Sequence, residues 1–167
     1  MFKVNDYVMY ATAGVCQVQK VDYPDFLKDG KRKYYFLKPL HSMCDIFVPV
    51  DTEVKMRKVL SREEANELLE QIPNMEEVWV EDDSSREAVY KEAIQSFDCR
   101  ELLKIIKCLY LKISERKKEG KKPLQMDEKY MNTAEQFLYG ELSVVLDIPM
   151  DEVSDYITKK VQQSTAT

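Results

Sequence analysis

The hydrophobic pattern of this 167-residue chain changes its period near residue 60, and this change limits the folds available to it. Before that point apolar and polar residues alternate in short runs, as in Val15-Cys16-Gln17-Val18-Gln19, which is typical of half-buried strands. After it, apolar residues recur every three or four positions, which is typical of amphipathic helices. The sequence therefore predicts a β region followed by an α region.

The β region is small. Gly14 stands between the first two runs, where a tight turn needs the positive φ that glycine adopts without steric cost. Five short strands in sixty residues are too few for a broad sandwich, so we expect a small curled sheet or SH3-like barrel. The strands are predicted at 7–10, 15–21, 33–37, 45–50 and 54–59.

The α region opens with a capping box, in which the Ser61 hydroxyl accepts from the third helical amide and Glu64 reaches back. Asp98 is the predicted N-cap of the third helix, and Gly120 its stop. Pro149 is predicted as the first residue of the fifth helix. The helices are predicted at 61–72, 84–97, 98–120, 126–146 and from 149 on, with irregular structure at 73–83 and a disordered tail at 162–167.

Composition disfavours most enzyme classes. Four glycines leave no phosphate-binding loop, and His41, the single histidine, follows a strand in what reads as a surface turn. Four cysteines without a C-x-x-C pair favour neither a disulfide framework nor a zinc site, so no cofactor or metal is expected. A thiol-dependent or hydrolytic enzyme that relies on His41 or a cysteine remains the rival hypothesis.

The chain shows no signal for a membrane. No apolar run approaches the roughly 20 residues of a membrane span. The N-terminal segment lacks the apolar stretch of a signal peptide, so a soluble cytoplasmic protein is expected.

Charge is distributed unevenly along the chain. Residues 1–60 carry a net +3, residues 61–95 a net −8 and residues 100–129 a net +5. In the predicted helix 98–120 the stripe Leu102, Ile106, Leu109 and Ile113 indicates a core face. The ridge nearly opposite holds Arg100, Lys104, Lys107 and Lys118. This ridge is either a surface that contacts phosphates by charge or an ordinary solvated face.

Several motifs in their joint order resemble the CarD family of bacterial transcription regulators, over about residues 1–160. In the β region these are Phe2-Lys3-Val4, Asp6, Val8, Tyr10, Gly14-Val15, Tyr34-Tyr35, Leu37-Lys38-Pro39-Leu40 and Val48-Pro49-Val50-Asp51. In the α region they are Tyr90-Lys91, the helix 98–112, Glu128-Lys129 and Leu138-Tyr139-Gly140-Glu141-Leu142.

The resemblance implies an α+β protein of two domains. A Tudor-like or SH3-like barrel at 1–60, similar to the RNA polymerase-interacting domain of the transcription-repair coupling factor, would bind the polymerase β subunit. An all-α bundle of about five helices at 61–167 would contact promoter DNA, and together they would modulate open-complex stability without catalysing a reaction. The polymerase contacts would map to Val21, Tyr23, Pro24, Cys44, Ile46, Phe47 and Val48.

Phe47 is the most informative of these positions. By alternation it lies on the opposite face from Ile46 and Val48, so it is either an exposed interface anchor or a second core aromatic in a thin barrel. Members of the family often carry an arginine here, so the charge-assisted contact they make is not expected in this chain.

The α region, which the resemblance expects to contact DNA, departs from the sequence pattern of the family. Members insert a tryptophan into the minor groove from four residues before the tyrosine that matches Tyr90, and Arg86 stands at that position here. Trp79 either packs in the helical core or acts as a displaced wedge, although acidic neighbours disfavour a wedge. We expect weak, largely nonspecific DNA contact through Arg86, Lys91, Arg100, Lys104, Lys107, Lys129 and Trp79. The alternative is a polymerase-tethered adaptor whose helical domain binds another protein and no DNA.

Overall fold

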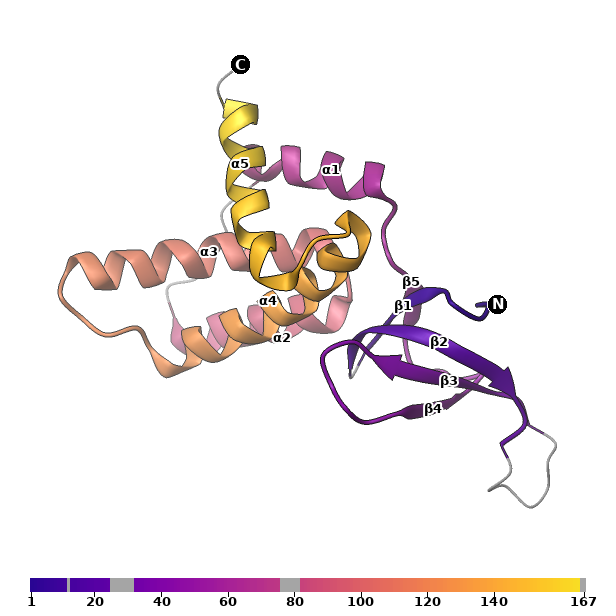
Figure 1. The fold of residues 1–167 in the computed structure, drawn as a ribbon. Helices are drawn as coiled ribbons and strands as arrows, with labels where there is room; N and C mark the ends of the chain where they lie inside the picture. The colour runs from indigo at the N-terminus through magenta and orange to yellow at the C-terminus, as the bar shows by residue number, and fades with distance from the viewer. Residues whose placement is uncertain (12, 25–31, 76–81, 166–167) are drawn as a thin grey trace. The chain divides into compact units, whose positions relative to one another are not determined.

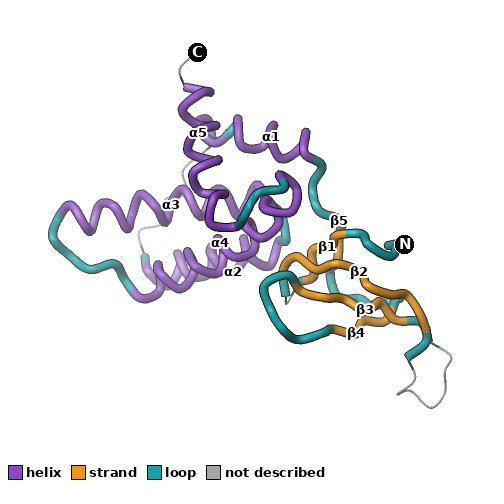
Figure 2. Tube along the Cα trace, viewed as in Figure 1, coloured by secondary structure: helices purple, strands orange, loops and turns teal. Residues whose placement is uncertain are grey.

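The computed structural model describes residues 1–11, 13–24, 32–75 and 82–165. The chain divides into two compact units, Met1–Leu60 and Ser61–Thr167. The first is an antiparallel sheet and the second is helical (Figures 1 and 2). Each unit is described by itself below.

The sheet has five strands: β1 (Tyr7–Tyr10), β2 (Gly14–Asp22), β3 (Tyr34–Pro39), β4 (Ile46–Pro49) and β5 (Met56–Lys58). Their spatial order is β4-β3-β2-β1-β5, and every described pairing is antiparallel. Gly14, at the start of β2, has the positive φ of 75° that the turn from β1 requires. The predicted turn at this glycine is confirmed.

One face of the sheet holds the core of the first unit. Its buried members are Val8, Cys16, Val18, Tyr35, Leu37 and Val48. In β3 and β4 they stand next to more exposed residues, because successive side chains of a strand point to opposite faces. In β1 and at the start of β2 both faces are covered, since Met9 and Val15 are buried as well. Phe2 packs over this core: its ring lies 5.6 Å from that of Tyr35, and its backbone N–H donates to the Tyr35 hydroxyl at 3.2 Å.

The predicted fold class, a small β module followed by a helical domain, is confirmed, and in the described residues the module is an open sheet rather than a closed barrel. β4 and β5 stand at opposite ends of the strand order, and in the described residues each pairs with a single neighbour. β5 also begins two residues later than predicted. A turn takes up the preceding backbone, because the Thr52 N–H donates to the Pro49 carbonyl and the Val54 N–H to the Thr52 hydroxyl.

The second unit contains α1 (Arg62–Glu70), η1 (Ile72–Asn74), α2 (Asp83–Ser96), α3 (Cys99–Lys118), α4 (Gln125–Leu146), η2 (Met150–Glu152) and α5 (Val153–Thr165). The long helices α3 and α4 run side by side, with α2 packed against both (Figure 1). The core stripe predicted on α3 is confirmed: Leu102, Ile106 and Leu109 are buried and Ile113 is half-buried. Among the described residues, no helix is long and apolar enough to cross a membrane.

The predicted helix signals have direct counterparts. The Ser61 hydroxyl accepts from the Glu64 N–H at 3.1 Å, and a Glu64 carboxylate oxygen accepts from the Ser61 N–H at 3.2 Å, so the capping box is confirmed. Asp98 caps α3 by accepting from the Arg100 N–H at 2.8 Å. Gly120, just beyond the end of α3, has a φ of 74°.

The end of the chain differs from the prediction. Pro149 precedes a single 3₁₀ turn, and α5 begins only at Val153, because the Glu152 N–H bonds back to the Pro149 carbonyl. The backbone of α5 is helical to Thr165, and the disorder expected for residues 162–167 remains a prediction. α5 is fastened to α1: the Tyr156 hydroxyl donates to Asn66 at 2.7 Å.

Candidate interaction surfaces

The outer face of the sheet carries a row of one cation and two aromatic side chains across three strands. Lys20 of β2 pairs in register with Phe36 of β3, and Phe36 pairs with Phe47 of β4. The ring centroids of Phe36 and Phe47 are 4.8 Å apart with an interplanar angle of 84°. The Lys20 Nζ lies 5.5 Å from the Phe36 centroid, within the range of a cation–π contact. We call Lys20, Phe36 and Phe47 the outer row.

The alternatives left open for Phe47 are resolved by its burial. Its side chain is 45% exposed, whereas Val48 beside it is 2% exposed and belongs to the core. Phe47 is therefore an outward-facing aromatic residue on β4, an edge strand of the described sheet. An aromatic side chain that keeps nearly half its surface in water retains hydrophobic free energy that a partner can recover.

A second exposed aromatic residue follows β2. Tyr23 is 45% exposed, and the Lys33 Nζ lies 5.8 Å from its ring. The Tyr23 backbone N–H donates to the Asp22 carboxylate at 2.8 Å. This bond, together with the neighbouring Lys20, lowers the pKa of Asp22, which stays ionised beside the outer row.

The remaining sheet residues predicted to meet the polymerase divide by burial. Cys44 is exposed, just before β4. Val21 and Ile46 are half-buried and pack against the core. The side chains of Val48 and Pro24 are buried, so these two residues can offer a partner only their main chain.

In the helical unit the residues predicted to contact DNA differ in their exposure and in their partners within the unit. Lys91 of α2 and Lys129 of α4 are exposed, and both lie near Glu87. The Tyr130 hydroxyl donates to Glu87 at 2.9 Å, and the Lys91 Nζ lies 3.6 Å from the same carboxylate. The Tyr130 hydrogen bond, then Lys91 and Lys129, lower the pKa of Glu87. The structure thus brings together basic residues that are 38 positions apart in the sequence.

The predicted basic ridge of α3 is largely engaged within the protein. The Lys107 Nζ donates to the carbonyls of Ile72 and Met75, at 3.2 Å each, and so fastens η1 to α3. Arg100 donates to the Gln71 side chain at 2.6 Å, and Lys104 lies 3.4 Å from Glu101. The Arg100 and Lys107 contacts hold the turn after α1, a role that the helical periodicity of the charges did not indicate.

Arg86 requires a correction. Its side chain is 7% exposed, and its Nη2 lies 3.2 Å from Oδ1 of Asp127, which is 1% exposed. A guanidinium held inside the unit by a buried carboxylate cannot reach a DNA groove, so we remove Arg86 from the interface. Trp79 lies outside the described residues, and both hypotheses about it remain predictions.

Sequence reasoning also missed two buried acids. Asp127 enters the sequence analysis only through the net charge of residues 100–129, and Glu141 only through a family motif, yet both are almost fully buried. The Cys99 thiol donates to Glu141 at 2.9 Å. A signal for Asp127 was present, because its neighbours Met126 and Tyr130 belong to the apolar face of α4. Within the described residues, no cluster of three or more His, Cys, Asp or Glu side chains could hold a metal ion.

The first unit is thus a small β module with a well-packed core and an exposed aromatic side chain on an edge strand of the described sheet. Residues 2–60 match the family model of the CarD-like/TRCF RID domain, the RNA polymerase-interacting domain shared with the transcription-repair coupling factor. This domain is a non-catalytic protein-interaction domain, and the match supports an RNA polymerase-associated transcription factor. A comparison with curated proteins found no significant match.

Proposed function

We propose that the chain binds the β subunit of RNA polymerase through β4 and the outer row, contacts promoter DNA weakly through the helical unit, and thereby modulates open-complex stability. The observation that carries the proposal is the exposed Phe47 on an edge strand of a CarD-like/TRCF RID domain.

The polymerase half of the proposal follows from the position of β4. An edge strand is a template for an added strand of a partner, which gives affinity through main-chain hydrogen bonds and specificity through alternate side chains. Phe47 and the neighbouring Phe36 supply the apolar contact on the outer face. Buried Val48 holds the strand in place on the core side.

The proposed DNA contact is supported by the exposed positive charges of the helical unit and not by a groove-shaped surface. Lys91 and Lys129 are exposed and close to one Glu87 carboxylate. The last turn of α3 adds the exposed Lys117 and Lys118, and the segment before α4 adds the exposed Lys122. Such side chains neutralise phosphates without reading bases. Few contacts of this kind give weak binding, which suffices when the polymerase supplies a high local concentration of DNA.

The regulatory effect is a coupling free energy. If the open promoter complex gains DNA contacts that the closed complex lacks, about 1.4 kcal/mol of differential binding shifts their ratio tenfold. No chemical step is required of the chain.

The polymerase half is tested by binding of the purified β subunit to the full chain and to the variant Phe47→Ala. We expect a clear loss of affinity, because an exposed aromatic anchor of an interface is removed. Tyr110→Ala is the matched control, since Tyr110 is an exposed aromatic residue of the helical unit. Equal binding by both variants and the unchanged chain would contradict the proposed surface.

A second candidate function is an adaptor whose helical unit binds a protein and no DNA. It is favoured by the engagement of Arg100, Lys104 and Lys107 within the unit, which leaves fewer cations for phosphates. Titration of salt against binding to forked promoter DNA separates the two, because phosphate contacts require affinity to fall steeply with salt concentration. Binding that is absent or insensitive to salt would favour the adaptor.

A further inference from the structure

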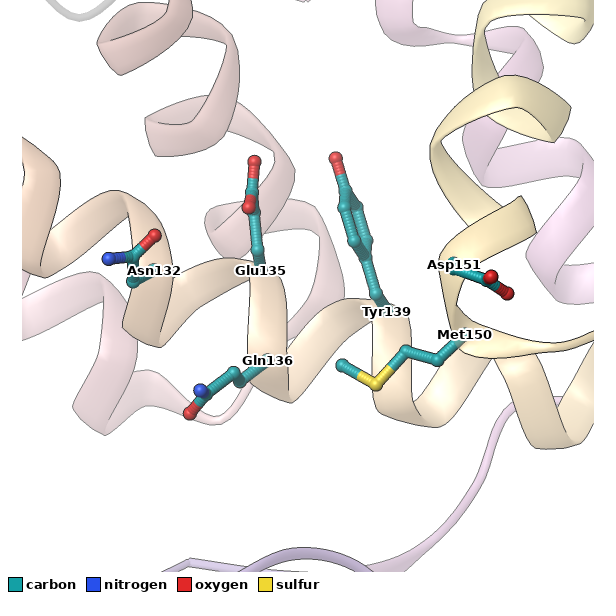
Figure 3. Close-up of a pocket in the computed structure, with 6 residues that line it drawn as sticks. All are labelled: Asn132, Glu135, Gln136, Tyr139, Met150 and Asp151. Carbon is teal, nitrogen blue, oxygen red and sulfur yellow. The ribbon is translucent and has the colours of Figure 1, made fainter. Parts of the chain in front are cut away.

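Two hollows adjoin on the helical unit. The larger, about 590 Å³, lies among η1, α3, α4 and α5, and the smaller, about 500 Å³, lies between α4 and η2. Both are lined by Glu135 and Tyr139, which lie one helical turn apart on α4. In Figure 3 these two side chains stand side by side and point the same way, with Met150 and Asp151 beyond Tyr139. We call the two hollows together the α4 groove.

The wall of the larger hollow is mainly apolar. Leu103 and Ile106 come from α3, Met131 from α4 and Ile157 from α5. Tyr110, which also lines this hollow, is 63% exposed, so apolar surface continues out of the groove. A surface of this kind takes up aliphatic or aromatic groups.

The carboxylate of Glu135 indicates that a ligand of the groove carries a positive charge. The Glu135 side chain is half-buried, and in the part of the chain that the structure describes its carboxylate makes no hydrogen bond or ion pair. Burial raises the pKa of Glu135, because its ionised form is poorly solvated. Lys107 lines the same hollow, but its Nζ already donates to the carbonyls of Ile72 and Met75.

We propose that the α4 groove binds a segment of a partner protein that carries a lysine or arginine next to apolar side chains. The cation would face the Glu135 carboxylate and the ring of Tyr139, while the apolar side chains would lie against Tyr110, Met131 and Ile157.

The shape of the groove favours a peptide segment over a small molecule. Two open hollows that share one wall form an elongated track along α4, and exposed Tyr110 extends it. Amphipathic segments dock in such tracks through apolar side chains spaced along one face. The site is separate from the proposed polymerase surface, which lies on β2, β3 and β4, and does not depend on it.

The test uses the full chain and a fluorescein-labelled amphipathic helical peptide with leucines on one face and lysines on the other. Fluorescence anisotropy measures its affinity, and a second peptide has every lysine replaced by glutamate. We expect the lysine peptide to bind and the glutamate peptide not to. Glu135→Gln should weaken binding of the lysine peptide about five- to tenfold, the value of one charge-assisted contact.

Two further variants locate the binding. Glu128→Gln is the matched control, since Glu128 is an exposed carboxylate on the same helix outside the groove, and it should leave affinity unchanged. Ile157→Ser should weaken binding without changing charge. The proposal is overturned if the lysine and glutamate peptides bind equally well, or if Glu135→Gln and Glu128→Gln have the same effect on affinity. It is also overturned if hexylamine alone binds as tightly as the lysine peptide and this binding depends on Glu135.

Discussion

Arg86 and Asp127 form a buried ion pair that joins α2 to α4, with 3.2 Å between Nη2 and Oδ1. Tyr90, one turn after Arg86, lies against the same pair, and its ring is 5.6 Å from that of Tyr130. Burial, with smaller contributions from Asp127 and Cys108 that Arg86 opposes, raises the pKa of Tyr90 to about 12. The position that the family resemblance assigns to a DNA-inserting side chain therefore serves the packing of two helices here.

Arg86→Ala is expected to destabilise the helical unit by about 3–5 kcal/mol, because it leaves the Asp127 carboxylate buried without its cation. Urea unfolding followed by far-ultraviolet circular dichroism measures this. The double variant Arg86→Met with Asp127→Leu should recover much of the loss, since no unpaired charge then remains. A loss below about 1 kcal/mol for Arg86→Ala, the range of an exposed pair, would contradict the buried pair.

Phe47→Arg is expected to change polymerase binding while leaving stability nearly unchanged, because the side chain points away from the core. Val48→Ala is the contrasting variant. It removes buried methyl groups and should cost about 2 kcal/mol. Thermal unfolding of both variants checks the difference, and a large fall in melting temperature for Phe47→Arg would place Phe47 in the core.

Lys91→Gln combined with Lys129→Gln is expected to weaken binding to forked promoter DNA and to reduce the slope of log affinity against log salt. Each lost phosphate contact lowers that slope by about 0.7–0.9. The protein should remain as stable as before, since both side chains are exposed. An unchanged slope would exclude this pair from the DNA interface.

Lys107→Met should lower stability and leave DNA binding nearly unchanged, which is the reverse of the result expected for the combined Lys91 and Lys129 variant. Its Nζ donates to two carbonyls after α1, so its loss should destabilise the helical unit by about 1–3 kcal/mol, the cost of leaving part-buried acceptors unsatisfied. DNA affinity of the folded protein should change little. A marked loss of DNA binding with unchanged stability would restore Lys107 to the proposed interface.

Glu135 is expected to make stability depend on pH. Because burial raises its pKa in the folded state, the folded protein holds the proton more tightly than the unfolded chain. Its unfavourable contribution to stability is absent below the unfolded pKa, grows as pH rises from the unfolded towards the folded pKa, and is fully present above the folded pKa. Glu135→Gln should therefore stabilise the protein at neutral pH and lose this advantage in acid. Urea unfolding across that pH range measures the difference, and a gain that does not vary with pH would contradict it.

Most of the fold was predictable from the sequence, because the patterns that define strands, helix starts and helix ends are local. Alternation predicted the strands, the Ser61–Glu64 box the start of α1, and Gly120 the end of α3. Whether such a sheet closes into a barrel depends on whether β4 and β5 meet, which is a long-range relationship that no local pattern encodes.

The candidate surfaces were less predictable for the same reason. Alternation placed Phe47 opposite Val48 but left open which face was core, and only the packing of Tyr35 against Val48 decides it. A charge count treats Arg86 and Lys107 like any surface cation. Their true partners, Asp127 and the carbonyls of Ile72 and Met75, lie more than thirty residues away in sequence.

The burial of the cysteines gives the protein a single convenient labelling position. Cys16, Cys99 and Cys108 are buried, and burial raises the pKa of the Cys16 thiol to about 11, which suppresses its thiolate. Cys44 is exposed two residues before β4. A maleimide dye should therefore attach there selectively, and its emission would report directly on any molecule that settles along this strand.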